Sequence, residues 1–70
     1  MILLKRLRIN KGLTETELAH LVGAETESIK AIERGDFSSL YRVRLLRLKA
    51  ALNYKGDPYE LLKPNKNPTK

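Results

Sequence analysis

The sequence predicts an all-α fold, a compact bundle of five helices. Apolar residues recur at helical spacing, helix-capping residues and glycines divide the chain at short intervals, and no stretch shows the alternation typical of strands. With 70 residues and no cysteine, the chain has room for one small domain without disulfides. We expect this domain to span residues 1–63. Residues 64–70 carry no apolar side chain and are expected to be a disordered basic tail.

The first helix is expected over residues 2–10. Its leucines would face the core, and its basic residues, Arg8 among them, would face solvent. Gly12 would end it, because glycine adopts a left-handed conformation without steric cost.

The second and third helices are expected over about residues 15–22 and 26–34, and the boundaries of the second are the clearest in the chain. Thr14 can cap the second helix with its hydroxyl, and Glu17 completes a capping box three residues later. Gly23 follows the last apolar residue of that helix and predicts a tight turn. Two short helices joined in this way bury their inner faces and leave one outer face exposed, which is typical of a helix-turn-helix.

The starts of the third and fourth helices are less clearly marked. Either Glu25 or Thr26 could cap the third helix. Ser38 or Ser39 is expected to cap a fourth helix that runs to about Asn53 and is the most basic element of the chain.

A fifth, short helix is expected after Gly56. Asp57 can cap it, Pro58 suits the first helical position, and Glu60 lies at the third. Pro64 limits its length, because a proline disfavours helical geometry at the residue before it.

The segment TETELAHLVGAETESIKAIERG, residues 14–35, resembles the XRE family of helix-turn-helix proteins, the Cro and phage-repressor type. The residues that match the family's pattern in register are Thr14, Leu18, Ala19, Gly23, Ile29, Ile32, Glu33 and Gly35. A weaker likeness extends over residues 2–62. The resemblance implies a lambda-repressor-like fold and a sequence-specific regulator of transcription, repressor-like, that inserts its third helix into the major groove of double-stranded DNA.

Charge is unevenly distributed along the chain. The formal net charge is +6, which favours nucleic acid as a partner. Residues 14–35, however, hold two basic and five acidic residues, whereas residues 36–70 hold eight basic and three acidic ones. The predicted reading helix is therefore acidic and its flanks are basic.

The resemblance places the base-reading positions in the first turns of the third helix. The candidates are Glu25, Thr26, Glu27, Ser28 and Lys30. A carboxylate can accept from the amine of cytosine, and a threonine methyl can touch the thymine methyl. For Glu25 and Glu27 a second explanation has equal weight, because the helix dipole favours acidic residues in a first turn.

Phosphate contacts are expected on both flanks of that helix. The candidates are Thr14, Glu15, Arg6, Lys11, Ser38, Ser39, Tyr41, Arg42 and Arg44. Hydroxyl and cationic groups can fix a protein on a duplex without reading its sequence. Glu15 is the exception, because many family members have glutamine at this position and an ionised carboxylate has no proton to donate. The basic residues of the fourth helix could also form only a solvated face.

Tyr54, Tyr59, Leu61 and Leu62 could either complete the core or form the apolar patch of a homodimer. The resemblance implies that elements at the C-terminal end often dimerise.

No enzymatic activity is expected. His20 is the sole histidine, and no second histidine, cysteine or carboxylate cluster accompanies it, so no metal site, catalytic group or cofactor is predicted. No small-molecule ligand is expected, and no apolar run approaches the ~20 residues that span a bilayer. We expect a cytoplasmic, nucleoid-associated protein of a prokaryote or phage.

A second hypothesis is a protein-interaction module on the same fold. The run from Glu33 to Leu40 is similar to the turn in the helix-turn-helix domain of the rod-shape cytoskeletal anchor, which binds an actin-like protein. An antitoxin-like protein that binds both DNA and a protein partner lies between the two hypotheses. In either case the acidic third helix would contact protein.

Overall fold

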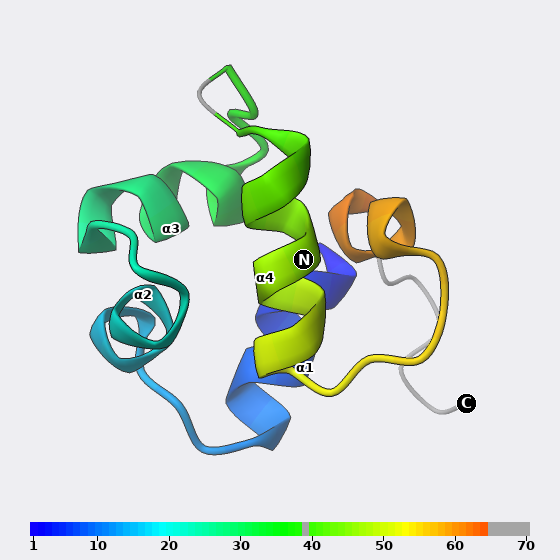
Figure 1. Cartoon of the computed structure of the whole chain (residues 1–70), viewed down its shortest axis with the longest axis horizontal. Coiled ribbons are helices and arrows are strands. Elements are labelled where there is room, and N and C mark those ends of the chain that lie inside the picture. The colour runs from blue at the N-terminus through cyan, green and yellow to red at the C-terminus, as the bar shows by residue number, and fades with distance from the viewer. Residues whose placement is uncertain (39, 65–70) are drawn as a thin grey trace.

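The computed structural model describes residues 1–38 and 40–64. Within these residues it contains four α-helices, one 3-10 helix and no strand (Figure 1). The elements are α1 (Leu3–Asn10), α2 (Glu15–Val22), α3 (Thr26–Arg34), α4 (Arg42–Ala51) and η1 (Pro58–Leu62). The all-α prediction is confirmed, and the bounds of α2 and α3 agree with the sequence prediction.

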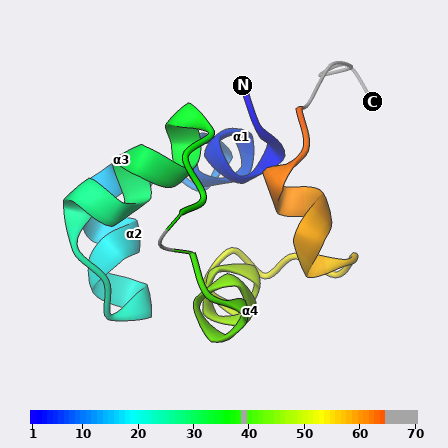
Figure 2. The same cartoon turned by 90° about the horizontal axis from the view of Figure 1, so that it is seen from above.

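The helices surround one small core. In two perpendicular views α4 lies between the α2–α3 pair and η1, and Figure 2 shows α1 on the side of the domain opposite α4 (Figures 1 and 2). Every element contributes apolar side chains to the interior. The buried apolar residues are Ile2, Leu4, Leu18, Ala19, Val22, Ile29, Ile32, Leu45, Leu48, Leu52 and Leu61. The core is therefore formed jointly by all five elements.

The prediction of a fifth α-helix is wrong. The expected capping is present, since the Asp57 side chain accepts from the Tyr59 N–H and Pro58 occupies the first turn. The segment nevertheless forms a five-residue 3-10 helix. Between Pro58 and Pro64 there is too little chain for an α-helical ladder, because proline donates no hydrogen bond and excludes helical geometry at Lys63.

The start of α4 also differs from the prediction. Tyr41 is its N-cap residue and makes no capping bond through its side chain. Ser38 instead bonds within the preceding loop, where its N–H and its hydroxyl both donate to Asp36 Oδ1, at 3.1 and 2.8 Å. Ser38 therefore shapes the loop and does not cap α4. The other proposed cap, Ser39, lies outside the described residues.

The two ends of the described chain meet. The N–H of Leu3 donates to the carbonyl of Lys63 at 2.9 Å, and Ile2 forms an isolated antiparallel bridge with Pro64. These two contacts join the N-terminal residues to the segment that follows η1. The remainder of the predicted tail, residues 65–70, lies outside the described residues.

Candidate nucleic-acid interface

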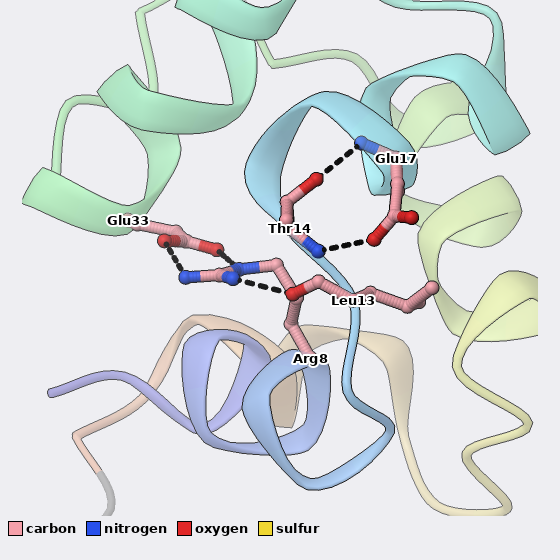
Figure 3. Close-up of polar contacts among 5 residues, drawn as sticks. All are labelled: Arg8, Leu13, Thr14, Glu17 and Glu33. Carbon is pink, nitrogen blue, oxygen red and sulfur yellow. Dashed lines mark hydrogen bonds and ion pairs between the residues drawn. The ribbon is translucent and has the colours of Figure 1, made fainter.

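The start of α2 has the predicted capping box. The Glu17 N–H donates to the Thr14 hydroxyl at 3.0 Å, and the Thr14 N–H donates to the Glu17 carboxylate at 2.8 Å (Figure 3). Two backbone N–H groups that a helix start would leave unpaired are satisfied in this way. The first residue of α2 is therefore held in place from within its own turn.

Gly23 makes the turn between α2 and α3. Its φ of 70° is left-handed, a conformation that costs other residues steric strain. The N–H of Ala24 then donates back to the carbonyl of Ala19 at 2.8 Å, which closes the end of α2. Two residues later α3 begins, with Glu25 as its N-cap residue and no capping bond from the side chain.

A buried ion pair fixes α3 relative to α1. Arg8 donates to both carboxylate oxygens of Glu33, from Nε at 2.7 Å and from Nη2 at 3.1 Å, and also to the Leu13 carbonyl at 2.7 Å (Figure 3). The Glu33 side chain is only 3% exposed. Arg8 was predicted to face solvent, and this prediction is wrong. It lies on the core side of α1, four residues after Leu4, and its burial is tolerated because every contact just named satisfies the guanidinium.

The electrostatics of this pair involve a further residue. The hydrogen bonds to Glu33 raise the pKa of Arg8, burial opposes this effect, and the negative charges of Glu33 and Glu15 reinforce it. Glu15, a predicted phosphate contact without a proton to donate, therefore contributes to the field around Arg8.

The predicted base-reading residues lie at the N-cap and in the first turns of α3, and they differ in exposure. Glu25, Glu27 and Lys30 are exposed, whereas Thr26 and Ser28 are half-buried. Only these first three candidates carry charged groups, and all three lie at the surface of the protein. The two carboxylates are thus at the surface of α3, as expected from the sequence.

Neighbouring side chains restrict two of these candidates. The Thr26 hydroxyl donates to the Thr16 hydroxyl at 3.3 Å, so it helps to join α3 to α2. The Lys30 ammonium lies 3.8 Å from a Glu27 carboxylate oxygen, one turn away on the same helix. Arg34 is exposed one turn beyond Lys30 and was not among the candidates. Because Arg34 follows Lys30 by four residues, helical spacing places both on the same side of α3 and makes Arg34 a further candidate for DNA contact.

The phosphate candidates on the N-terminal side of α3 come from α1 and from the start of α2. Thr14 and Lys11 are exposed, and Arg6 and Glu15 are half-buried. Arg6 belongs to α1, Lys11 and Thr14 to the connection after it, and Glu15 to the first turn of α2.

The candidates around α4 do not form one surface. Arg42 donates from Nη1 to the Tyr59 hydroxyl at 3.1 Å, and its guanidinium carbon lies 5.7 Å from the centre of the Tyr59 ring. These contacts direct Arg42 toward η1, on the side of α4 away from α3 (Figure 1). Tyr41 is 64% exposed, and Arg44 is half-buried. Arg47, which was not predicted, lines a surface hollow together with Gly23.

The residues proposed for a dimer patch are largely used by the fold itself. Leu61 is fully buried, and Tyr54 and Leu62 are partly buried against the core. The Tyr54 hydroxyl donates to Glu60, and Tyr59 contacts Arg42. Of the two alternatives left open for these residues, a place in the core agrees with the burial of Leu61.

Within residues 1–38 and 40–64, no three metal-ligating side chains of His, Cys, Asp or Glu are gathered into one cluster. His20 is exposed on α2. None of the helices described is both long enough and apolar enough to cross a membrane.

Comparison with known protein families, curated proteins and solved structures gives no significant match for this chain.

Proposed function

We propose that this chain is a sequence-specific double-stranded DNA-binding regulator of transcription, of the XRE type, with a lambda-repressor-like fold. The observation that carries the proposal is the pair α2 and α3, which are joined through a left-handed Gly23 and present a polar outer side of α3. A helix held in this way can enter the major groove, which is wide enough to admit one. The net charge of +6 supports a polyanionic partner.

In this proposal α3 divides into two parts. Its N-terminal turn offers the carboxylates of Glu25 and Glu27, which suit the exocyclic amines of cytosine and are repelled by phosphates. Its last two turns offer Lys30 and Arg34, which suit guanine or the backbone. Discrimination between DNA sequences would thus come from the first turn of α3. Much of the affinity for DNA would come from the cations in its last two turns.

Equilibrium binding measured by fluorescence anisotropy tests this proposal. Duplexes selected from a randomised pool are compared with an unselected duplex, at low and at physiological salt. Affinity should fall by orders of magnitude between ~50 and ~200 mM salt, but the preference for the selected duplex should remain. Arg34→Ala should weaken binding to every duplex, whereas Lys55→Ala, an exposed cation between α4 and η1, is the matched control.

Substitution of the two glutamates tests the reading role directly. The double change of Glu25 and Glu27 to glutamine removes the repulsion but keeps the length of both side chains, so it should alter which duplex is preferred. Equal binding to all duplexes that disappears at physiological salt would contradict the proposal, because only non-specific attraction to the basic flanks would then be present.

A second candidate function is a protein-interaction module, cytoskeletal-anchor-like or antitoxin-like. It is favoured by the exposed carboxylates at the start of α3 and by the position of Lys30 beside Glu27, which reduces the positive field there. The same double glutamine variant separates the two functions. A loss of a protein partner, with no change in DNA binding, would support the second candidate.

A further inference from the structure

One exposed side of α4 has the residue spacing of a helix-packing surface. The residues at positions i, i+3, i+4 and i+7 of this side are all exposed, and they are Val43, Leu46, Arg47 and Ala50. Val43 and Leu46 are 60% and 42% exposed. The four residues cover two turns, or about 10 Å of helix. Because Leu45 and Leu48 pack into the core from another side of α4, these four residues form a second packing surface, which we call the α4 stripe.

A surface hollow lies beside the α4 stripe. It is lined from α2 by residues 20–23 and from α4 by Arg47, Ala50 and Ala51. Arg47 and Ala50 therefore belong both to the stripe and to the hollow. On the α2 side of the hollow, Leu21 is 59% exposed. A ligand that packs along the stripe thus meets a further large apolar side chain across the hollow.

The charge around the α4 stripe is positive. Residues 37–56 contain five basic residues and no acidic one. Arg47 is exposed, and no carboxylate in the part of the chain that the structure describes lies within ion-pair distance of it. Glu17 of α2 lines a neighbouring hollow and not this one. The stripe thus combines apolar contact area with a cation, which favours an apolar partner that carries carboxylates.

We propose that the α4 stripe binds an acidic amphipathic helix of a partner protein. Recognition of a helix in a groove uses anchors at positions i, i+3, i+4 and i+7, which is the spacing of the stripe itself. The partner helix lays its apolar side over Val43, Leu46 and Ala50. It places one side chain in the hollow beside Leu21 and presents a carboxylate to Arg47, which fixes its register along α4.

This interaction is distinct from both functions proposed above. The protein partner of the second candidate function would contact the carboxylates of α3, whereas the partner proposed here is itself acidic and contacts α4. Arg47 is not among the candidates for DNA contact. The inference therefore does not depend on whether α3 binds DNA, and its test uses the protein and a peptide alone.

Other occupants satisfy only part of the α4 stripe. A second copy that used the same stripe about a two-fold axis would bring two positive surfaces together. A DNA backbone would pair with Arg47 but would leave three apolar side chains facing phosphates. An anionic membrane would suit both charge and apolarity, but a helix that lies in a membrane interface normally buries a larger apolar face, and a flat bilayer does not fill a hollow.

Fluorescence anisotropy of a labelled synthetic peptide tests the proposal with the full chain. The probe has about 18 residues, with leucines at i, i+3, i+4 and i+7 and glutamates beside them, because shorter peptides form helices poorly in water. A peptide of the same composition in scrambled order, without a continuous apolar side, is the control ligand. The ordered peptide should bind about tenfold more tightly than the scrambled one. Equal binding of the two peptides would overturn the proposal, because charge alone would then explain the attraction.

Substitutions in the chain locate the binding surface. Leu46→Gln should weaken binding of the ordered peptide about tenfold, and Arg47→Ala about threefold. The matched controls are Ile9→Gln and Lys11→Ala, which change an exposed apolar residue and an exposed cation at the end of α1, on the side of the domain opposite α4 (Figure 2). Circular dichroism checks that every variant is folded. Peptide binding that is insensitive to Leu46 and Arg47, or that the controls weaken equally, would overturn the proposal.

A charge reversal tests the pairing of Arg47 with a carboxylate. Arg47→Glu should bind the acidic peptide more weakly than Arg47→Ala does, and it should bind a peptide with lysines in place of the glutamates more tightly than the wild type does. Lys11→Glu changes the net charge by the same amount and is the control for long-range attraction. Equal effects of the two reversals would contradict a local pairing at Arg47 and overturn the proposal.

The remaining occupants are tested with the same Leu46 variant. Vesicles that contain anionic phosphatidylglycerol are offered to the wild-type chain and to Leu46→Gln, and both are examined by sedimentation without a ligand. If vesicle binding or dimerisation depended on Leu46 while the ordered peptide bound no better than the scrambled one, the surface would belong to a membrane or to a second copy. Either result would overturn the proposal, and neither would bear on DNA binding by α3.

Discussion

Arg8 and Glu33 join α1 to α3 through a bidentate ion pair whose side chains are almost fully buried. The same guanidinium holds the carbonyl of Leu13, just before the capping box of α2. One side chain thus connects α1, the entry to α2 and the last turn of α3. The position of the last turn of α3 relative to α1 and to the entry of α2 therefore depends on this connection.

Removal of one partner of this pair should strongly destabilise the protein. Arg8→Ala leaves the Glu33 carboxylate buried without its cation, and such changes cost about 3–5 kcal/mol. That is comparable to the whole stability expected of a domain of this size, so circular dichroism should show a largely unfolded chain.

A double variant provides the contrast. Arg8→Met together with Glu33→Leu replaces the pair by apolar groups of similar volume but leaves the Leu13 carbonyl without its donor. Its urea midpoint should therefore lie below that of the wild type and well above that of Arg8→Ala. A double variant as unstable as Arg8→Ala would contradict this interpretation, because the pair itself would then supply the stability.

The turn between α2 and α3 should be sensitive to any side chain at Gly23. A Cβ there would lie 3.6 Å from the Arg47 guanidinium, which is an ordinary contact, so space is not the obstacle. The left-handed backbone is the obstacle, and Gly23→Ala should cost about 1–2 kcal/mol in urea unfolding. Gly23→Asn should cost less, since asparagine tolerates this conformation better. Equal losses for the two variants would point to steric crowding instead.

Tyr54 should make stability depend on pH in the alkaline range. Its hydroxyl donates to Glu60, and this bond, aided by burial and by the charge of Glu60, raises the pKa of Tyr54. Because the folded pKa lies above the unfolded value of about 10, the contact stabilises the fold below that pH and is lost as the pH rises through the folded pKa. The urea midpoint should therefore fall above about pH 10.

Tyr54→Phe is the control for this titration. It removes the hydroxyl but keeps the ring, so the urea midpoint of this variant should fall less above about pH 10 than that of the wild type. If the urea midpoint of the variant fell as steeply with pH as that of the wild type, groups other than Tyr54 would be responsible for the fall.

The parts of the fold that were predicted correctly are those set by neighbouring residues. The bounds of α2 and α3 follow from the Thr14–Glu17 capping box and from the glycines at positions 23 and 35, all within one turn of the helix ends they define. Two of the errors are also local, namely the 3-10 helix between Pro58 and Pro64 and the bonding of Ser38 to Asp36, but the error at Arg8 involves a residue distant in sequence. Arg8 looks like a surface cation until Glu33, 25 positions away, is known to face it.

In the candidate site, too, features set by neighbouring residues could be predicted and features set by distant residues could not. The exposed carboxylates at the start of α3 could be located from helical spacing alone. The contact of Arg42 with Tyr59 could not, because it depends on where η1 packs against α4. The exposed apolar residues of α4 are hard to find from sequence because four basic residues dominate the pattern of the helix, although Val43, Leu46 and Ala50 have helical spacing.

The N-cap of α3 should be open to improvement. Glu25 occupies that position without a capping bond, whereas the Thr14 hydroxyl accepts one at the start of α2. Thr14→Ala should therefore cost about 1 kcal/mol, and Glu25→Ser should stabilise the chain by about 0.5–1 kcal/mol, because a serine hydroxyl can accept from the first turn of α3. Urea unfolding of both variants measures the difference. A gain at Glu25 would show that the wild-type glutamate costs stability, as expected of a residue that serves in binding. A loss would show instead that the carboxylate already supports the helix through its dipole.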